Sequence, residues 1–564
     1  MASTRPLTPQ TALFGILTSQ VGYESGLPKH VIVRATEKSR IAEPAVVVVS
    51  DGRRDVVRAP AEYWGYLWHS HWWRADVSQV TAPGRYSVRL ETGGKSIAAD
   101  DIEVGWQMIW GRTFELSAID QLEKRARFAE AKVGWLDAGM PWFELNAHAS
   151  TILALCEVLT LVPGRLTGDQ RGRIERQIVN GCDYQSLLQD EAAKRGLSPG
   201  SLSHQIPKFE DITTRSDANK AAAAWAAAAR VLGAALPEKA ADYRKRAVAA
   251  LGFAVSPGED AGFGFNHKQR GLPDSYVPPK DDFRTRDLFM SARAALELSA
   301  QGHLELLALA VELLDRAMSR QAPTERSMHG LSGWFYEFGD LHHPEPAWAH
   351  QLRDRKAGGD LGATHAYDVS VFIQALAAHP DHPRAPAWRN TLERFAYGFF
   401  LPACRANPFY LLPQQLHSSE GIITFAGPWH GMNCIYGQAA ALAFDLAALL
   451  GDSALIPVAT GNLQWVCGLN AGVHRENIAF CHIYSCDIPA GVALPVSMIH
   501  GVGARFAGSW LNFRGTVTNG FSVGEQFHFD AAATRENDGP HSLSDEDWIP
   551  HAAGLVSALC RVGR

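Results

Sequence analysis

The first hundred residues contain short runs rich in β-branched and aromatic side chains. Gly and Pro separate these runs, for example at Gly26, Pro83 and Gly84. This pattern predicts β-strands joined by turns. The runs lie at 30–35, 45–50, 66–77 and 84–90. Several such strands in about 95 residues favour an immunoglobulin-like β-sandwich over residues 12–105.

After Gly105 the spacing of apolar positions becomes helical, and alanine and leucine dominate. The expected helices are 111–128, 143–162, 170–192, 216–234, 237–254, 284–301, 303–320, 364–379, 385–400, 432–450, 453–468 and 546–561. Twelve helices, taken as six hairpins, predict an (α/α)6 barrel over residues 106–564. The helices do not repeat in sequence as solenoid units do, which argues against an open array.

Long connections rich in Gly, Pro, His and aromatic residues separate these helices. They cover 193–215, 255–283, 321–363, 401–431 and 469–545. Loops of this length in a compact domain are usually functional. If alternate connections fall on one face of the barrel, they wall a cleft there.

The net charge and the hydropathy of the chain limit which kinds of partner it can bind. The chain has 564 residues, 46% of them hydrophobic, and a net charge of -6 without any Lys/Arg run. We therefore expect no nucleic-acid partner. No apolar run approaches 20 residues, so we expect no membrane span. We make no prediction of the oligomeric state.

Residues 1–18 carry Arg5 but no continuous apolar segment, so we expect no signal peptide and a cytoplasmic protein. Removal of a signal would instead place it in the periplasm or outside the cell. Eight cysteines scattered through apolar segments favour buried thiols. Cys481 and Cys486 flank His482, which leaves a disulfide or metal site as alternatives, although zinc sites prefer tighter paired spacings.

The 16 tryptophans are the informative excess in the composition. An indole offers a flat apolar face on which the axial C–H groups of a sugar ring can stack. Most tryptophans nonetheless serve hydrophobic cores. The count favours a carbohydrate partner without establishing one.

Several segments resemble glycoside hydrolase family 9 and its N-terminal cellulase-type immunoglobulin-like domain. The opening "SQVGYESGLPKHVIVRA" (19–35) and the turn "VTAPGRYSV" (80–88) are similar to that immunoglobulin-like domain. The barrel resembles the family at "GWLDAGMPWFELNAHAS" (134–150), "WHGMN" (429–433), "LQWVCGLNAG" (463–472) and "DEDWIPHAAGLVSAL" (545–559). The resemblance runs along the whole chain, but each motif is degraded.

The resemblance implies an inverting glycoside hydrolase that cleaves β-glycosidic bonds in a polysaccharide or oligosaccharide. Aligning the last segment places Glu546 on the family's general acid. The resemblance of 134–150 places Asp137 on the aspartate that helps to hold the nucleophilic water. The family's general base falls on Met140, which cannot accept a proton. Glu144, one turn further on, is a candidate substitute. The family's H-x-R substrate-binding motif is also missing after Gly468.

Acetal hydrolysis by inversion needs two carboxyl groups about 6.5–9.5 Å apart, one to protonate the leaving oxygen and one to activate water. Trp548 and the apolar helix after Glu546 would desolvate that carboxyl and keep it protonated near neutrality. By their positions alone, Glu546 and Asp137 also fit structural roles, because carboxylates at helix starts act as caps.

Further site candidates come from the motifs and from the long connections. The expected substrate-binding residues are Trp135, Trp142, Arg284, Trp334, Trp429, His430, Trp510 and His528. Arg215 and Asp217, before the alanine-rich helix, are further candidates. Loop arginines suit an acidic sugar because a guanidinium binds a carboxylate through two hydrogen bonds. Each of these loop residues also fits a salt bridge or a helix cap.

Two other functions remain open on the sequence. A polysaccharide lyase acting on a uronic-acid-containing glycan fits the missing base and the abundant His, Tyr and Arg of the loops. A non-catalytic barrel that binds glycans fits Met140 as a mark of lost catalysis. Asp281 and Asp282 make a structural calcium ion a candidate, but their pattern matches no defined ion loop, so we assign no metal and no cofactor.

Overall fold

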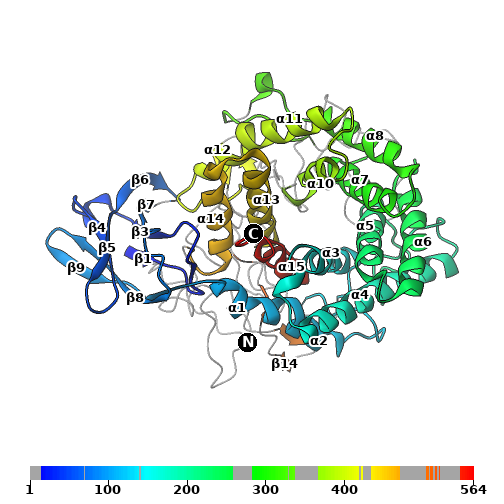
Figure 1. Cartoon of the computed structure of the whole chain (residues 1–564), viewed down its shortest axis with the longest axis horizontal. Helices are drawn as coiled ribbons and strands as arrows, with labels where there is room; N and C mark the ends of the chain where they lie inside the picture. The colour runs from blue at the N-terminus through cyan, green and yellow to red at the C-terminus, as the bar shows by residue number, and fades with distance from the viewer. Residues whose placement is uncertain are drawn as a thin grey trace, which may run out of the picture.

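The computed structural model describes residues 14–68, 70–138, 142–257, 283–327, 329–336, 366–413, 415–417, 421–423, 433–470, 504–506, 509–511, 515–517, 520 and 547–564. A β-sandwich packs against one side of a ring of helices (Figure 1). This arrangement confirms the predicted fold class, an immunoglobulin-like β-sandwich followed by an (α/α)6 barrel.

The sandwich is built from two sheets. The first contains β1 (Phe14–Leu17), β3 (His30–Ala35), β7 (Ser70–Asp76) and β6 (Glu62–Leu67), in that order. The second contains β2 (Tyr23–Glu24), β10 (Ile102–Gly105), β8 (Gly84–Thr92), β4 (Val46–Ser50) and β5 (Asp55–Pro60), with β9 (Lys95–Ala98) paired to β8. Strand β10 runs parallel to β2, and the other described pairs are antiparallel.

The central strands of the first sheet, β3 and β7, are largely buried on both faces, which explains the apolar run from Val31 to Val33 in β3. Val31 and Val33 point into the sandwich core. Ile32 points the other way and joins the core of the barrel together with Trp72. The Trp72 ring meets Phe409 of the barrel edge to face, with centroids 5.3 Å apart. Side chains of the first sheet therefore fix the sandwich to the barrel.

Outer and inner helices alternate along the chain. The outer positions are α1 (Met108–Glu115) with the π-helical turn η2 (Leu116–Asp120) and α2 (Gln121–Ala126), α4 (Gly168–Lys194), α6 (Pro237–Ala254), α8 (Leu306–Met318), α11 (Ala385–Phe395) with the π-helical turn η6 (Ala396–Phe400) and α12 (Leu401–Arg405), and α14 (Ile456–Val466). The inner positions are α3 (Leu145–Leu161), α5 (Arg215–Leu232), α7 (Thr285–Ser299), α9 (Ala366–Val369) with α10 (Val371–Ala378), α13 (Asn433–Leu450) and α15 (Ile549–Leu559). Each expected helical segment is present, with ends shifted by a few residues.

Small residues let the inner helices pack closely in a closed ring. Neighbours around the ring are α3, α5, α7, α9 with α10, α13, α15 and again α3. Helix α5 is alanine-rich, and Ala221 to Ala229 are buried against the helices around it. A Cβ on Gly437 of α13 would lie 2.2 Å from the carbonyl carbon of Gly554 in α15, so only glycine permits this backbone contact.

Backbone hydrogen bonds also fix the sandwich to the barrel. The N–H groups of Gln20 and Val21 both donate to the carbonyl of Cys467, at 3.1 and 3.0 Å. The Gln464 amide of α14 donates to the carbonyl of Gly22 at 3.1 Å. The last strand of the sandwich ends at Gly105, and α1 begins at Met108.

Helix α13 is long and apolar enough to cross a membrane by length and composition alone. Because 67% of that segment is buried inside the protein, it serves as a core helix of the ring. The six cysteines within the described ranges are buried free thiols, at positions 156, 182, 404, 434, 467 and 560. Cys481 and Cys486 lie outside the described residues.

Candidate active site

The N-terminal ends of the inner helices gather at one face of the barrel. The Asn219 amide in α5 donates to the Asp287 carboxylate in α7 at 3.1 Å. The Cys434 N–H of α13 donates to Nδ1 of His551 in α15 at 3.0 Å. Helix N-termini carry unpaired N–H groups and the positive ends of the helix dipoles, which favour acidic side chains. This end of the ring is the candidate active-site face.

Asp137 lies in the turn that leads into α3 and is fully buried. Its Oδ2 accepts the Glu144 N–H at 2.6 Å. Its own N–H donates to the Trp142 carbonyl at 3.0 Å. The Asp137 carboxylate therefore fixes the backbone at the residue immediately before α3.

The segment that follows Glu546 is bonded to the segment that carries Asp137. The Arg125 guanidinium donates to Asp547 Oδ2 at 2.9 Å and to the Leu136 carbonyl at 3.0 Å. The Ile549 N–H donates to the Asp137 carbonyl at 2.8 Å. Arg125 is completely buried, so this connection is shielded from water. Two segments from opposite ends of the helical domain thus meet at the start of α15.

His204 joins two acidic residues at the same face. Its Nδ1 lies 2.9 Å from Asp217 Oδ2, and its Nε2 lies 3.6 Å from Glu144 Oε1. The Leu145 N–H donates to the His204 carbonyl at 3.0 Å, which ties this loop to the start of α3. The side chains of His204 and Asp217 are 2% and 4% exposed, whereas that of Glu144 is 24% exposed. Glu144 is therefore the member of this group that reaches solvent.

The two carboxylates keep the imidazole protonated. Burial by itself lowers the pKa of His204, but the charges and hydrogen bonds of Asp217 and Glu144 outweigh it and raise that pKa to about 10. Burial likewise opposes ionisation of Asp217, yet the His204 imidazolium holds the pKa of that carboxyl below its usual range. His204 and Asp217 therefore form a buried ion pair at neutral pH.

Arg284 forms an internal ion pair at the start of α7. Its Nε donates to Asp287 Oδ2 at 2.8 Å, and both side chains are buried. Burial opposes ionisation of Asp287, but the Arg284 guanidinium lowers the pKa of that carboxyl. Arg284 lies at the candidate face, where it holds Asp287 and, through it, the Asn219 amide.

An aromatic pair flanks the His204 group. The rings of Trp142 and Phe209 stack with centroids 5.8 Å apart and an interplanar angle of 12°. The Phe209 ring meets the His204 ring edge to face at 6.3 Å. Lys208 and Phe209 both have positive φ values, 68° and 56°. Residues other than glycine rarely adopt positive φ values. Those that do often lie at functional sites. Trp142 is half-buried and keeps an exposed part at this face.

Trp135 and Trp334 lie in the core of the barrel, where they are 0% and 2% exposed. The Trp135 ring stacks on His148 with centroids 5.1 Å apart, and its Nε1 donates to Gln177. The Trp334 ring packs edge to face on Tyr336 at 4.7 Å. Neither ring offers a face to a sugar in this structure, because the core encloses both, so each supports the fold behind the site.

The other residues expected from the sequence lie outside the described residues or on their margin. Trp510 belongs to β14 (Ser509–Leu511), which pairs with β13 (Ala504–Phe506). Outside the described residues lie Met140, Asp281, Asp282, Trp429, His430, His528 and Glu546. Within the described part of the chain, no group of three or more His, Cys, Asp or Glu side chains is placed to hold a metal ion.

Sequence reasoning missed His204 and Phe209. Both lie in the first long connection, 193–215, which the sequence marks as functional by its length alone. A single loop histidine carries no periodic signal, and its partners are on two different helices. Asp217 was among the candidates, but its histidine partner emerges only from the packing of the ring.

Solved structures share this fold over nearly the full chain. A metagenome-derived glycoside hydrolase family 9 endoglucanase is 16% identical with a TM-score of 0.62, covering 98% of this chain and 99% of its own. A Bacteroides ovatus protein of the same family is 14% identical with a TM-score of 0.59, covering 97% and 98%. A single mutant of a thermostable endoglucanase from Alicyclobacillus acidocaldarius is 15% identical with a TM-score of 0.57, covering 97% and 99%. No sequence profile of a protein family and no curated protein matches the chain. The chain therefore has the glycoside hydrolase family 9 fold.

Proposed function

We propose that this protein is a glycoside hydrolase that cleaves β-linked glucans with inversion. The fold supports the reaction class, because structures with this architecture are described as endoglucanases, and one as a complex with a cellobiose-like isofagomine. In this proposal Glu546 is the general acid that protonates the leaving oxygen, as the resemblance of 545–559 implies.

The observation that carries the proposal is the connection between the two acid-bearing segments. Arg125 and the Ile549 N–H hold the chain beside Glu546 against the turn that contains Asp137. Glu144 stands at the end of that same turn. The described residues next to Glu546 thus lie at the same end of the barrel as Asp137 and Glu144, which supports a two-carboxylate hydrolysis.

We assign the water-activating base to Glu144, because Met140 cannot accept a proton. Glu144 combines a partly exposed carboxylate with a neighbouring imidazolium that orients it. His204 stays protonated near neutrality, so it serves as a positioning residue and not as the base. Asp137 is buried and bonded to the Glu144 N–H, so its proposed role is to position the base.

The proposed reaction is a single displacement. Glu546 donates its proton to the glycosidic oxygen as the bond from that oxygen to the anomeric carbon breaks. Water attacks the anomeric carbon from the opposite face and gives a proton to Glu144, which leaves a hydroxyl of inverted configuration. The exposed part of the Trp142 ring would lie against an adjacent sugar, because aromatic rings present a flat apolar surface.

The first test is Glu546→Gln assayed on soluble β-glucan. Turnover should fall by about 100- to 10,000-fold, the usual contribution of general acid catalysis. Denaturant unfolding should remain as in the unaltered protein. Glu238→Gln, on the exposed first turn of α6, is the matched control and should retain full turnover. A fully active Glu546→Gln would overturn the assignment of the acid.

The second test separates the base from the positioning residues. Glu144→Ala should lower kcat by about 100-fold or more with little change in KM, since it removes a group that acts on water. Added azide should restore turnover by taking the place of the activated water. On β-glucan the product should be the inverted anomer, as seen by NMR. With a uronic-acid-containing glycan as substrate, products that absorb as unsaturated uronides would show elimination and contradict hydrolysis.

A further inference from the structure

The barrel contains a cavity at the end opposite to the candidate active-site face. Its volume is about 1030 Å³, and the C-terminal halves of inner helices line it. Glu157 in α3 is a lining residue, and Glu144 precedes the same helix. Their separation of 13 positions in the sequence corresponds to about 20 Å along a helix at 1.5 Å per residue. The cavity is therefore separate from the His204 group.

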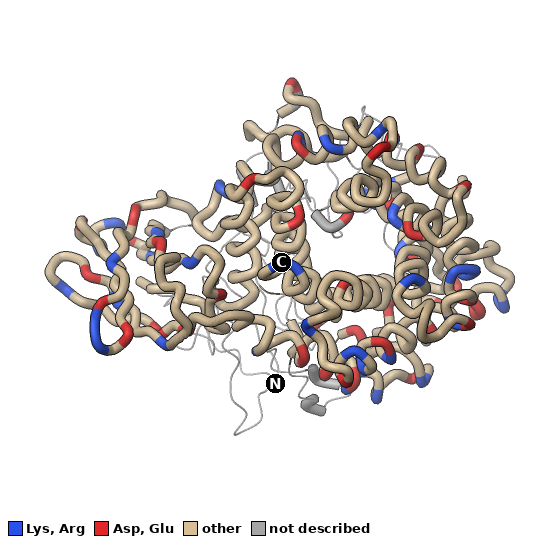
Figure 2. Tube along the Cα trace, in the orientation of Figure 1, with Lys and Arg blue, Asp and Glu red and all other residues tan. Residues whose placement is uncertain are grey.

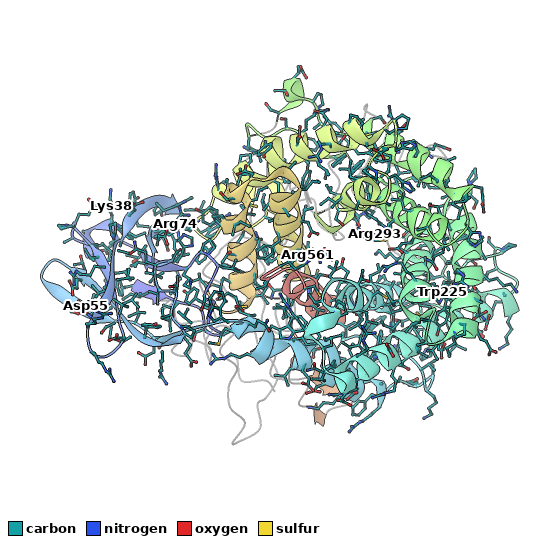
Figure 3. The ribbon with its side chains drawn as sticks, viewed as in Figure 1. Lys38, Asp55, Arg74, Trp225, Arg293 and Arg561 are labelled. Atoms are coloured by element: carbon teal, nitrogen blue, oxygen red, sulfur yellow. The ribbon has the colours of Figure 1, made fainter. Side chains whose placement is uncertain are left out.

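Small side chains leave this end of the ring open. Ala227 of α5, Ala377 of α10 and Ala448 of α13 all line the cavity. Larger side chains at these three positions would occupy the space at the centre of the ring. Figure 3 places Arg293 and Arg561 on two sides of the opening in the ring.

Charged groups of both signs line the cavity in nearly equal number. The carboxylates are Glu157, Glu297 and Asp445, and the guanidinium groups are Arg230, Arg293, Arg561 and Arg564. Three negative and four positive charges leave a formal sum of only +1. An anion would meet the three carboxylates and a cation the four guanidinium groups, so neither sign is clearly favoured.

Ion pairs hold these groups in fixed orientations. Arg561 donates to Glu157 at 2.8 Å and to Asp445 at 2.7 Å. On another wall, Arg230 donates to Glu297 at 2.8 Å, and the Gln374 amide donates to the same carboxylate at 3.2 Å. A carboxylate has about four lone-pair sites and a guanidinium five N–H donors, so these pairs leave groups available to a ligand.

We propose that this cavity is a second binding site, and that it takes a small neutral saccharide. A sugar hydroxyl donates one hydrogen bond and accepts two, so vicinal hydroxyls suit a lining of alternating carboxylates and guanidinium groups. Leu153, Ile373 and Phe444 supply apolar surface for the C–H face of the ring. The cavity is also of ordinary size for a ligand site with convergent polar groups.

The experiment uses two neighbouring alanines of α10 in the full chain. Ala377 lines the cavity and is exposed at its mouth, whereas the adjacent Ala378 is exposed but does not line it. Ala377→Phe should obstruct the cavity, and Ala378→Phe is the matched control. Calorimetry with D-glucose and with cellobiose should show a binding site that Ala377→Phe weakens at least about tenfold and that Ala378→Phe retains.

Charged sugars of the same size test the ligand class. D-glucosamine and D-glucuronate should bind at the cavity more weakly than D-glucose. Tighter binding of either one there would overturn the neutral class. Equal binding of every sugar by Ala377→Phe and the unaltered protein, or no binding by the unaltered protein, would overturn the site. Ala448→Phe, at another lining position, repeats the test if Ala377→Phe does not fold.

The proposed binding site and the proposed catalysis can be tested separately. Glu546→Gln should abolish turnover and leave binding at the cavity unchanged. Ala377→Phe should do the reverse, with turnover on β-glucan within about twofold of the unaltered protein. Loss of both properties in Ala377→Phe would overturn the separation of the two sites.

Discussion

The two ends of the helical ring hold buried charged clusters of different composition. At the candidate active-site face, Asp217 and Glu144 lie on either side of the titratable cation His204, and Arg284 pairs with Asp287 nearby. At the opposite end, Arg561 bridges Glu157 and Asp445, and further arginines line the cavity. Glu144 precedes α3 and Glu157 lies in α3, so the two clusters share this helix. His204 is a titratable cation, whereas Arg561 is permanently charged.

The direction of the inner helices explains part of this difference. Their N-termini carry unpaired N–H groups, and Asp137 and Thr214 accept such groups before α3 and at the start of α5. Their C-termini carry unpaired carbonyls, and Arg561 donates to the Ser557 carbonyl at the end of α15 at 2.8 Å. The helix dipole favours acidic side chains at the first end, where arginines pair with Asp547 and Asp287, and it favours cations at the second end. On the outer surface, by contrast, acidic and basic residues are interspersed (Figure 2).

The largest expected effect comes from removing the buried arginine at each end. Arg125→Met and Arg561→Met each leave carboxylates without their guanidinium and should lower the free energy of unfolding by about 3–5 kcal/mol. Arg125 holds the segment next to Glu546, whereas Arg561 is remote from it. Per folded molecule, Arg125→Met should therefore lose most turnover, and Arg561→Met should keep it.

Urea unfolding and turnover, measured on the same samples, check this contrast. Arg564→Met, at an exposed residue that also lines the cavity, is the control for loss of a positive charge and should change unfolding by little. If Arg561→Met lost as much turnover per folded molecule as Arg125→Met, the two ends would not be functionally distinct.

A smaller effect on the free energy of unfolding distinguishes the titratable cation His204 from the permanently charged Arg561. The raised pKa of His204, about 10, means that the folded state binds this proton more tightly than the unfolded state, whose histidine titrates near 6.5. The resulting stability is fully present below pH 6.5 and is lost as the pH rises toward about 10. His204→Gln should cost about 1.5–3 kcal/mol at pH 6, with a smaller cost at each higher pH.

Unfolding free energies measured from pH 6 to pH 10 test this pH dependence. His303 lies near Glu305, and its own side chain is 37% exposed. His303→Gln is the control and should leave the dependence of the unfolding free energy on pH unchanged. A cost for His204→Gln that stays constant with pH would contradict a raised pKa of His204 in the folded state.

The smallest expected effect compares two helix caps. Thr214 accepts the Asp217 N–H at the start of inner helix α5, and Thr167 accepts the Gln170 N–H at the start of outer helix α4. Alanine at either position should cost about 0.5–2 kcal/mol in denaturant unfolding. Only Thr214→Ala should also lower turnover, because it loosens Asp217 beneath His204. Equal turnover in the two variants would show that Asp217 does not contribute to catalysis through His204.

The order of elements could be predicted from the sequence, because each depends on neighbours in the chain. The β-branched run in 30–35 and the helical spacing in 216–234 are properties of single segments, and they appear as a strand and a helix respectively. The turn before α3 was also recognised as important from its motif. Its fully buried Asp137 side chain was not predictable, because burial depends on what the rest of the ring places over it.

The strands, the helices and their order follow from the sequence, since local periodicity sets which face of each element is apolar. Which side chains share an end of the ring depends on how the helices pack in three dimensions. His204 with Asp217, Arg125 with Asp547, and Arg561 with Glu157 each join residues from separate elements. The last two pairs are separated by 422 and 404 residues. Closure of the ring creates these contacts, and closure depends on all inner helices at once, so no single segment encodes them.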